Sequence, residues 1–278
     1  MITYNHEKYI EQAVRSVMMQ ETDFDYELLI GEDCSTDRTR EIVLHLGQEF
    51  PEKIRVVAHP TNQGMASNFI ALWNMSRGQY IAILDGDDCW IDSRKLQIQA
   101  DLLDREADTT ISIHSYRREY VDLAEYGDSD IFPKAHRNRI TPQAWAHKYS
   151  FIGTLTVMMR KVLPTLPDWM HDLRAFVDYP LYLITLQEQG GVIRILEGIP
   201  RAIYRVHSTS ATNLNRGARY ELWLRDLELI RSHVDTQFHA ALDHQTFYRK
   251  RDYLQHHIVN GDLVAASDRK STRLNSSH

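Results

Sequence analysis

The stretch Tyr80-Ile-Ala-Ile-Leu-Asp85-Gly-Asp87-Asp88 decides the fold. Its first five residues are mostly apolar, which is typical of a parallel strand that is buried on both faces. Three carboxylates follow at the carboxyl end of this strand, where open α/β sheets bind their ligands. Carboxylates this close repel one another, and a bound Mg²⁺ or Mn²⁺ would relieve that repulsion because both ions suit oxygen ligands. A solvated acidic turn is the alternative interpretation, since aspartate and glycine favour turns.

The segments that precede this strand predict a doubly wound sheet. Apolar residues at Ile10, Ala13, Val14 and Val17 have helical spacing. The residues between Asp37 and Pro51 indicate a second helix, and residues 65–75 a third. Strands are expected at 26–30, 54–58 and 80–84. With a strand end at the very start of the chain, the first 90 residues alternate strand and helix, which favours a mostly parallel sheet flanked by helices.

The second half is expected to add further strands and helices. Residues 120–140 are polar and irregular, which predicts a surface loop over the site. The pattern from Gly217 to about Ile258 is helical, and we expect a helical C-terminal extension there. The remaining elements are predicted as a helix capped by Asp92-Ser93, strands at 110–114, 154–159, 192–196 and 202–206, and a helix at 176–189.

Composition places the chain among ordinary soluble globular proteins. It has 278 residues, of which 43% are hydrophobic and 25% charged, and a net charge of −6 that argues against binding to nucleic acid. No apolar run reaches the length of about 18 residues that a transmembrane helix needs. The two cysteines, Cys34 and Cys89, are too few for a disulfide framework, so we expect a reduced, cytoplasmic protein.

Both ends of the sequence have unusual features. Met1 to Asn5 reads as the end of a strand, so the first strand is expected to be truncated. Residues 268–278 are similar to the in-frame translation of a sequencing adapter, and we exclude them from the fold prediction. The remaining chain divides into two halves of one domain, 1–118 and 119–215, and the helical extension at 216–267.

Four polar clusters follow predicted strands. They are Thr3 to Glu7, Glu32-Asp33, Asp85 to Asp88 and Arg205 to Ser208. The first three come after successive parallel strands, so they should converge at one edge of the sheet. Neither of the glycine-rich phosphate motifs GxGxxG and GxxxxGK[ST] is present. We therefore expect a metal ion, rather than a glycine-rich loop, to hold any bound phosphate.

Taken in order, these motifs resemble a known family. Thr3-Tyr4-Asn5 with Glu7, Glu32 to Asp37, Asn62-x-Gly64 with Asn68, and Leu84 to Asp88 are similar to the bacterial family 2 inverting glycosyltransferases of GT-A fold. The resemblance covers nearly all of residues 1–215. It implies a nucleotide-sugar donor, a divalent cation (Mn²⁺ or Mg²⁺) and a single displacement at the anomeric carbon.

The resemblance also implies roles for individual residues. Asp33 would hydrogen-bond the nucleobase, for which its acceptor oxygens suit a uracil N–H, although a helix-capping acid is the alternative. Asp87 and His207 would ligate the metal, with Asp85 directed at the ribose. Arg205 could contact phosphate, although an arginine on a strand is often half-solvated, and a lone histidine such as His207 is often an ordinary side chain. The nucleotide-binding residues are then Thr3, Tyr4, Glu7, Asp33, Asn68 and Asp85, with Asp88 and Arg205 in support.

An inverting transfer needs one base for the proton of the acceptor hydroxyl. Phe176 to Leu181 is similar to the family segment that carries this base, which makes Asp178 the candidate. Asp168 and Asp172 are rivals. An aspartate in the first turn of a helix also stabilises the helix dipole, which is the structural alternative for Asp178.

The predicted function is transfer of a sugar, from a donor that we expect to be UDP-linked, to a saccharide or lipid-linked acceptor in the synthesis of bacterial surface polysaccharide or glycoconjugate. The expected location is the cytoplasm, with peripheral association at the inner membrane face as an option. One alternative is a metal-dependent sugar nucleotidyltransferase, which would need a glycine- and lysine-rich phosphate loop that is not seen. The other is a degenerate, non-catalytic nucleotide-binding protein, against which the intact Asp87, Asp178 and His207 argue.

Overall fold

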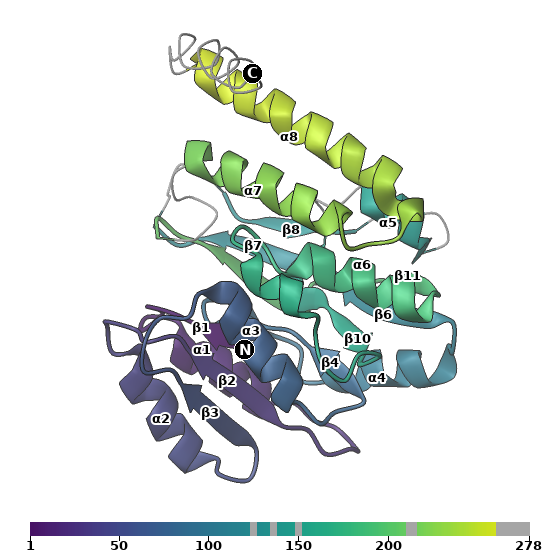
Figure 1. Cartoon of the computed structure of the whole chain (residues 1–278). Coiled ribbons are helices and arrows are strands. Elements are labelled where there is room, and N and C mark those ends of the chain that lie inside the picture. The colour runs from purple at the N-terminus through teal and green to yellow at the C-terminus, as the bar shows by residue number, and fades with distance from the viewer. Residues whose placement is uncertain (123–126, 134–137, 148–151, 210–215, 260–278) are drawn as a thin grey trace, which may run out of the picture.

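The computed structural model describes residues 1–122, 127–133, 138–147, 152–209 and 216–259 (Figure 1). The adapter-like segment 268–278 lies outside this range. The described chain forms a mixed α/β structure in which three sheets are covered by helices, and two long helices, α7 and α8, lie beyond them.

The first sheet is parallel and has the order β1-β2-β3. Its strands are β1 (Ile2–Thr3), β2 (Leu28–Glu32) and β3 (Ile54–Ala58). The connecting helices are α1 (Ile10–Met18), α2 (Thr39–Glu49) and α3 (Met65–Met75), followed by β4 (Tyr80–Ala82). The predicted alternation of strands and helices is confirmed. The apolar residues of α1 are buried at the predicted helical spacing.

The second sheet has the order β4-β10-β6-β11-β9 and mixes strand directions. Its added strands are β6 (Thr109–His114), β9 (Arg139–Ile140), β10 (Met158–Arg160) and β11 (Val192–Leu196). β10 runs antiparallel to both of its neighbours, whereas β11 runs parallel to β6. The strand predicted at 154–159 was wrong in its first half, because Thr154–Thr156 form a 3₁₀ turn before β10 begins.

The third sheet has the order β5-β12-β7-β8. Its strands are β5 (Cys89–Trp90), β7 (Tyr116–Tyr120), β8 (Ser129–Ile131) and β12 (Ala202–Val206). The surface loop predicted over 120–140 was therefore partly wrong, since β8 pairs with β7 at the sheet edge. Polar residues fit this position because one side of an edge strand faces solvent. Residues 123–126 and 134–137 of that segment are outside the described residues.

The helices that follow β5 complete the described chain. They are α4 (Lys95–Arg105), α5 (Pro142–His147), α6 (Asp178–Gln189), α7 (Arg216–Arg231) and α8 (His239–Val259). The large side chains of Trp145, Tyr179 and Tyr182 are fully buried at the α5–α6 contact. The predicted helical C-terminal extension is confirmed. Within the described residues, every helix is too short or too polar to span a membrane.

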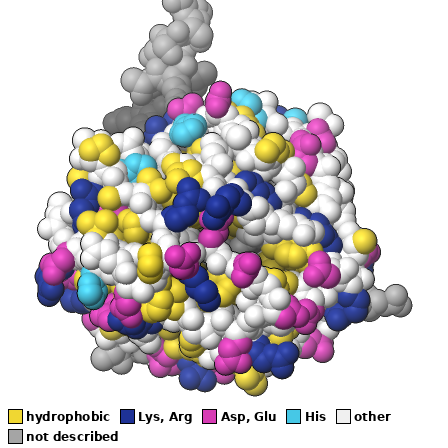
Figure 2. Space-filling model, turned by 90° about the horizontal axis from the view of Figure 1, so that it is seen from below, with side chains coloured by type: hydrophobic (Ala, Val, Ile, Leu, Met, Phe, Trp, Pro, Cys, Tyr) yellow, Lys and Arg dark blue, Asp and Glu magenta, His cyan; other side chains and the backbone are white. Residues whose placement is uncertain are grey.

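A single β-bridge links the first sheet to the segment that follows β4. Ile2 pairs with Gly31 of β2 on one side and with Asp85 on the other, both in parallel. This bridge brings the carboxyl ends of β1, β2 and β4 to one edge, as the sequence predicted. On the face seen in Figure 2, acidic and basic side chains are intermingled.

Candidate active site

The loop Asp85 to Asp88 turns tightly against the chain that follows β1. The Gly86 backbone N–H donates to the Ile2 carbonyl at 3.0 Å. A Cβ atom at Gly86 would lie 2.6 Å from Thr3 Oγ1 and 2.8 Å from His6 Nδ1. No larger residue fits this position without displacing one of those side chains. The glycine therefore allows the acidic loop to lie directly on the Thr3 to His6 turn.

Two histidines face the carboxylate of Asp87. His207 Nε2 lies 3.3 Å from Asp87 Oδ2, and His6 Nε2 lies 3.7 Å from the same oxygen. Burial favours the neutral form of Asp87, but the hydrogen bond with His207 and the nearby His6 outweigh it and hold the pKa of Asp87 below its usual value. Asp87 is therefore ionised at neutral pH. Thr3 and Thr209 hydrogen-bond the Nδ1 atoms of His6 and His207.

Arg205 and Asp88 hold this loop from behind. The Arg205 backbone N–H donates to Asp88 Oδ1 at 2.9 Å, and the Arg205 guanidinium donates to the Asp87 carbonyl at 2.8 Å. The same guanidinium also bonds Gln12 and Cys89. Burial, with Asp87 and Asp85 nearby, raises the pKa of Asp88 well above its usual value. These contacts hold the acidic loop in place, and they occupy the arginine that was predicted to reach phosphate.

Asp85 is the first residue of the acidic loop and is half-buried, whereas Asp88 is fully buried. Burial is the main cause that raises its pKa to about 7, and Asp87 and Asp178 raise it further, while the Met1 ammonium lowers it. Asp178 thus acts on Asp85 from the other half of the chain, although 93 residues separate them in the sequence. The fold brings the predicted ribose ligand and the predicted base into one electrostatic site.

Asp178 is the first residue of α6 and is half-buried. Its carboxylate accepts the backbone N–H of Tyr179 at 2.9 Å. The two rivals, Asp168 and Asp172, are exposed in the 3₁₀ helix Asp168–Asp172, and neither is among the charges that shift the pKa of Asp85. Of the three candidates, Asp178 is the one that this pKa shift places beside the acidic loop.

Residues after β1 interlock with the loop after β2. Asn5 has a positive φ of 57° and its side-chain oxygen accepts the Thr36 backbone N–H at 2.8 Å. Glu7 accepts the Arg38 backbone N–H at 3.0 Å. Thr3 is buried against His6, whereas Tyr4 is exposed. Tyr4 is therefore free of the loop contacts that occupy Glu7, and nucleotide binding by Thr3, Tyr4 and Glu7 stays a prediction.

Asp33 and Asn68 are both buried and both bonded within the protein. Asp33 accepts the backbone N–H groups of Gln63 at 2.7 Å and Gly64 at 2.9 Å. Asn68 donates to the Gly31 carbonyl at 2.9 Å, and its oxygen lies 3.1 Å from His59 Nε2. These bonds fix the 60–68 segment against β2. Each Asp33 oxygen keeps a further lone pair for a ligand, whereas the Asn68 amide is engaged on both atoms.

Comparison with known proteins decides the family. A model of the family described as "Glycosyl transferase family 2" matches residues 1–166. The chain belongs to this glycosyltransferase family. An uncharacterised protein of Mycobacterium tuberculosis is 32% identical over 222 residues, which are 80% of this chain and 62% of the relative. The chain therefore spans less than two thirds of that relative's length. TuaG of Bacillus subtilis, named for teichuronic acid biosynthesis, is 29% identical over 83% of this chain and 87% of its own.

Solved structures show the same fold. The Staphylococcus aureus TarS fragment 1–349 in complex with UDP matches with a TM-score of 0.60 at 19% identity, over 93% of this chain and 70% of TarS. The mannosyltransferase PcManGT of Pyrobaculum calidifontis, in complex with GDP-Man and Mn²⁺, matches with a TM-score of 0.55 at 14% identity, over 100% of this chain and 79% of its own. The α/β fold of GT-A type predicted from the sequence is confirmed.

Two residues near the predicted site residues were missed by the sequence analysis. His6 Nε2 lies 3.7 Å from Asp87 Oδ2, and it follows Asn5, whose positive φ of 57° periodicity does not reveal. Asp226 of α7 is buried, and its Oδ2 accepts the backbone N–H groups of Arg174 at 2.8 Å and Ala175 at 2.7 Å. It thereby fixes the segment that leads to Asp178. A polar residue on the apolar side of a helix was the available signal.

A divalent cation fits the groups around Asp87, although the protein alone does not complete a cage for it. Asp87 offers an ionised carboxylate oxygen, and His207 and His6 offer ring nitrogens directed at it. Among the described residues, no cluster of three or more His, Cys, Asp or Glu is arranged to hold a metal unaided. A cation here would need further oxygen ligands, which a diphosphate supplies.

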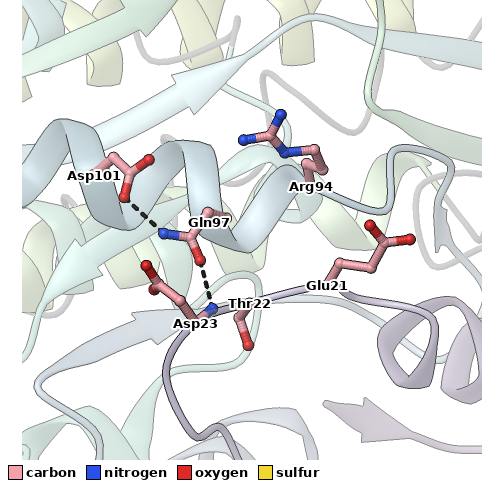
Figure 3. Close-up of a pocket in the computed structure, with 6 residues that line it drawn as sticks. All are labelled: Glu21, Thr22, Asp23, Arg94, Gln97 and Asp101. Atoms are coloured by element: carbon pink, nitrogen blue, oxygen red, sulfur yellow. Dashed lines mark hydrogen bonds between the residues drawn. The ribbon is translucent and has the colours of Figure 1, made fainter.

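A separate shallow pocket of about 480 Å³ lies between α4 and the loop after α1 (Figure 3). Gln97 crosses it, accepting from the Asp23 backbone N–H at 2.8 Å and donating to Asp101 at 2.7 Å. Its other lining residues are Glu21, Thr22 and Arg94. None of the site residues lines this pocket, so it plays no part in the chemistry considered below.

Proposed function

We propose that this family 2 glycosyltransferase moves a sugar from a nucleotide-diphosphate donor, UDP-linked, to an acceptor hydroxyl with inversion at the anomeric carbon. The observation that carries the proposal is the convergence of Asp85, Asp87, His207 and Asp178 at the carboxyl ends of the strands. An ionised carboxylate beside histidine suits the diphosphate end of a donor. An aspartate at the start of α6, near enough to raise the pKa of Asp85, suits the acceptor.

The proposed donor pocket runs from Asp33 to Asp85. Asp33 would accept a uracil N–H with the lone pairs left by its two backbone bonds. Asp85, with a pKa of about 7, would bond the ribose, and the exposed Tyr4 would contact the nucleobase. The UDP complex of TarS is consistent with this donor, whereas the GDP-Man complex of PcManGT makes the identity of the nucleobase worth testing.

We assign Mn²⁺ or Mg²⁺ to Asp87 and His207, with His6 beside them. The ion supplies Lewis-acid stabilisation of charge on the leaving diphosphate. The protein supplies the rest: Arg205 holds the Asp87 backbone, and Thr209 and Thr3 orient the two imidazoles. These residues keep the Asp87 carboxylate ionised and hold it in place, and this is how they would contribute to donor binding.

Asp178 is proposed as the base. It takes the proton from the acceptor hydroxyl while the hydroxyl oxygen bonds the anomeric carbon. The bond from that carbon to the diphosphate oxygen breaks, and the nucleoside diphosphate leaves with the electron pair. An inverting displacement needs the base and the leaving group on opposite faces of the sugar. We therefore assign Asp178 to the acceptor face and the metal ligands to the diphosphate face. One correctly placed base contributes roughly 10²–10⁴ in rate.

The proposed setting is the synthesis of bacterial surface polysaccharide, with a saccharide or lipid-linked acceptor on the cytoplasmic side. Named relatives support this setting. TuaG carries teichuronic acid biosynthesis in its name. The Escherichia coli enzyme WfgD, 33% identical over 103 residues that are 37% of this chain and 39% of its own, is named a glucosyltransferase for a diphosphoundecaprenol-linked acceptor.

Calorimetry with UDP and GDP, each with and without Mn²⁺, tests the donor assignment. We expect UDP to bind more tightly than GDP, and only with the metal. Metal-independent binding, or none, would remove the donor assignment and favour a degenerate protein. Release of UDP from a panel of UDP-sugars then identifies the sugar. Formation of UDP-sugar from UTP and a sugar phosphate would instead identify a nucleotidyltransferase.

The base is tested by Asp178→Asn, with the exposed Asp172→Asn as the matched control. We expect Asp178→Asn to keep UDP binding within about threefold and to lower transfer by about 10² or more. Asp172→Asn should change neither. Transfer that survives in Asp178→Asn would assign the base elsewhere, and Asp85→Asn is the next variant because the pKa of Asp85 near 7 also suits a base.

A further inference from the structure

The imidazole of His207 stacks on the ring of Tyr9, a residue with no part in the proposed donor and metal sites. The two ring centres lie 4.8 Å apart, and the ring planes are inclined by 29°. His207 is buried, with 2% of its surface exposed, whereas Tyr9 is half-buried. Tyr9 directly precedes α1 and His207 directly follows β12. The contact therefore joins the start of the first helix to the end of a strand in the third sheet.

The two hydrogen bonds of the His207 ring lie at its edge. Thr209 Oγ1 is 2.9 Å from Nδ1, and Asp87 Oδ2 is 3.3 Å from Nε2. Because both partners meet ring nitrogens, these bonds alone leave the imidazole able to tilt about the line that joins them. A contact on the face of the ring opposes this tilt, and the Tyr9 ring provides one.

The same tyrosine ring also contacts Arg205, which holds the main chain of Asp87. The guanidinium carbon of Arg205 is 5.5 Å from the centre of the Tyr9 ring, within the distance of about 6 Å that a cation–π contact requires. Gln12, in the first turn of α1, accepts a hydrogen bond from this guanidinium. The guanidinium in turn donates to the Asp87 carbonyl at 2.8 Å. Tyr9 thus contacts both side chains that bond Asp87 from β12 and its end.

The ring of Tyr9, rather than its hydroxyl, makes these contacts. Stacking and cation–π attraction both depend on the π face of an aromatic side chain. Among the described residues, the Tyr9 hydroxyl has no hydrogen-bond partner. Phenylalanine keeps the π face and loses only the hydroxyl, whereas leucine is apolar but offers no π face. These two replacements therefore separate the ring from the hydroxyl.

We propose that Tyr9 is a positioning residue for the metal centre, whose ring holds the His207 imidazole against the Asp87 carboxylate and the Arg205 guanidinium against the Asp87 carbonyl. The inference rests on the proposed assignment of the metal to Asp87 and His207. Replacing a residue that orients a metal ligand without touching the metal typically lowers metal affinity by about 10- to 100-fold. Tyr9 acts in this way through its neighbours, without reaching the ion or the donor.

Tyr9→Leu and Tyr9→Phe test the proposal, with Tyr248→Leu as the matched control. The Tyr248 ring also contacts an imidazole, that of His244, with the ring centres 4.5 Å apart. Both belong to α8, which lies at the far end of the molecule from α1 (Figure 1). Mn²⁺ titration followed by electron paramagnetic resonance, in the presence of UDP, gives the affinity for the ion. We expect Tyr9→Leu to weaken Mn²⁺ binding by about tenfold or more, and the other two variants to stay within about threefold of the parent.

Nuclear magnetic resonance of the metal-free chain reports the position of the imidazole directly. The face of the Tyr9 ring shifts the carbon-bound protons of the His207 ring to lower frequency, and the His207→Ala variant identifies their signals. We expect Tyr9→Leu to remove this shift and Tyr9→Phe to keep it. Tyr248→Leu should leave the His207 signals where they are. A loss of packing alone would lower the midpoint of urea unfolding without this pattern.

Equal Mn²⁺ affinities in Tyr9→Leu and the parent would overturn the proposal, as would unchanged His207 signals in Tyr9→Leu. An equal loss of affinity in Tyr9→Leu and Tyr9→Phe would also overturn it, because the hydroxyl would then be the active group. If the parent binds no Mn²⁺ with UDP, the metal assignment fails by itself, and the spectra of the metal-free chain still decide whether Tyr9 holds His207. Tyr9→Met gives the same comparison if Tyr9→Leu does not fold, since methionine adapts to irregular space.

Discussion

His207 Nε2 lies 3.3 Å from Asp87 Oδ2, although 120 residues separate the two in the chain. His207 follows β12 and Asp87 follows β4, so the contact joins the third sheet to the acidic loop. The Arg205 guanidinium, two residues earlier, bonds the Asp87 carbonyl, and the Tyr9 ring stacks on His207 at 4.8 Å. The His207 imidazole is therefore held by the Asp87 carboxylate and by the Tyr9 ring.

Replacing this imidazole should weaken metal-dependent donor binding. We expect His207→Ala to lower the affinity for UDP with Mn²⁺ by at least about tenfold, because a nitrogen ligand and the partner of Asp87 are lost together. Calorimetry measures the effect. The exposed His45→Ala on α2 is the matched control and should bind like the parent. Equal affinities in the two variants would contradict the metal assignment of His207.

His6→Ala separates the second imidazole from the first. The His6 ring lies 3.7 Å from the same Asp87 oxygen, and burial lowers the pKa of His6, which favours the neutral, metal-binding form. We expect a smaller loss of Mn²⁺-dependent UDP affinity than in His207→Ala, by about three- to tenfold. Mn²⁺ titration followed by electron paramagnetic resonance in the presence of UDP gives the ion's own affinity. An unchanged Mn²⁺ affinity would leave His6 as a support for Thr3 alone.

Asp85 should make stability fall as pH rises. The folded pKa of about 7 exceeds the ordinary value of 3.8, so the folded state binds the proton more tightly than the unfolded state between these values. The stabilisation is present below about pH 4 and is lost progressively up to pH 7. Asp85→Asn removes this dependence. The stability of the variant relative to the parent should therefore increase by about 3 kcal/mol from pH 5 to pH 8, measured by urea unfolding. Parallel curves would show that Asp85 is not buried as described.

The sequence predicted those parts of the fold that repeat locally. The apolar spacing of α1 and the strands 192–196 and 202–206 depend on neighbouring residues, and all were confirmed. The apolar run before Asp85 forms a strand only over Tyr80–Ala82, so the buried parallel strand predicted there was wrong in its length, its burial and its antiparallel pairing with β10. What it missed depends on contacts distant in the chain. The polar strand β8 forms because it pairs with the edge of β7. The direction of β10, antiparallel to β4, depends on a partner strand that is distant in the sequence.

The same division between local patterns and contacts distant in the chain applies to the candidate site. The acidic loop and Asp178 were found because their residue types stand at the ends of predicted elements. His6 and Asp226 were missed because a positive φ at Asn5 and a contact over 51 residues, from Ala175 to Asp226, leave no periodic trace. A strand end was expected at Met1 to Asn5, and β1 spans Ile2–Thr3 there.

Gly86→Ala should disrupt the acidic loop selectively. The added Cβ would meet Thr3 Oγ1 at 2.6 Å, so either the loop or the Thr3 to His6 turn must shift. We expect a loss of about 1–3 kcal/mol in the free energy of unfolding, as for other overpacked positions, together with a loss of metal-dependent UDP binding. Gly127→Ala is the matched control, because a Cβ there meets nothing within 4 Å. If both variants bind UDP normally, the loop does not depend on this close approach.

Asp226 offers a test of how Asp178 is positioned. Its Oδ2 accepts two backbone N–H groups, from Arg174 and Ala175, and a backbone hydrogen bond from Phe176 also acts on this carboxylate. An asparagine can place its single oxygen at the Oδ2 position and keep both bonds, whereas an alanine leaves both donors unpaired. We expect Asp226→Asn to stay within about 1 kcal/mol of the parent in unfolding free energy, and Asp226→Ala to lose about 2 kcal/mol or more.

The kinetics of Asp226→Asn and Asp226→Ala also distinguish a role in positioning Asp178 from a role in folding. Because the clamped segment leads directly to Asp178, Asp226→Ala should lower kcat for transfer by about tenfold or more while KM for the donor stays nearly constant. Asp226→Asn should restore kcat. Burial raises the pKa of Asp226, so the parent side chain already tolerates the neutral form that asparagine imitates. A variant pair that loses stability equally, or that changes donor KM rather than kcat, would show that Asp226 supports α7 alone and leaves the base where it is.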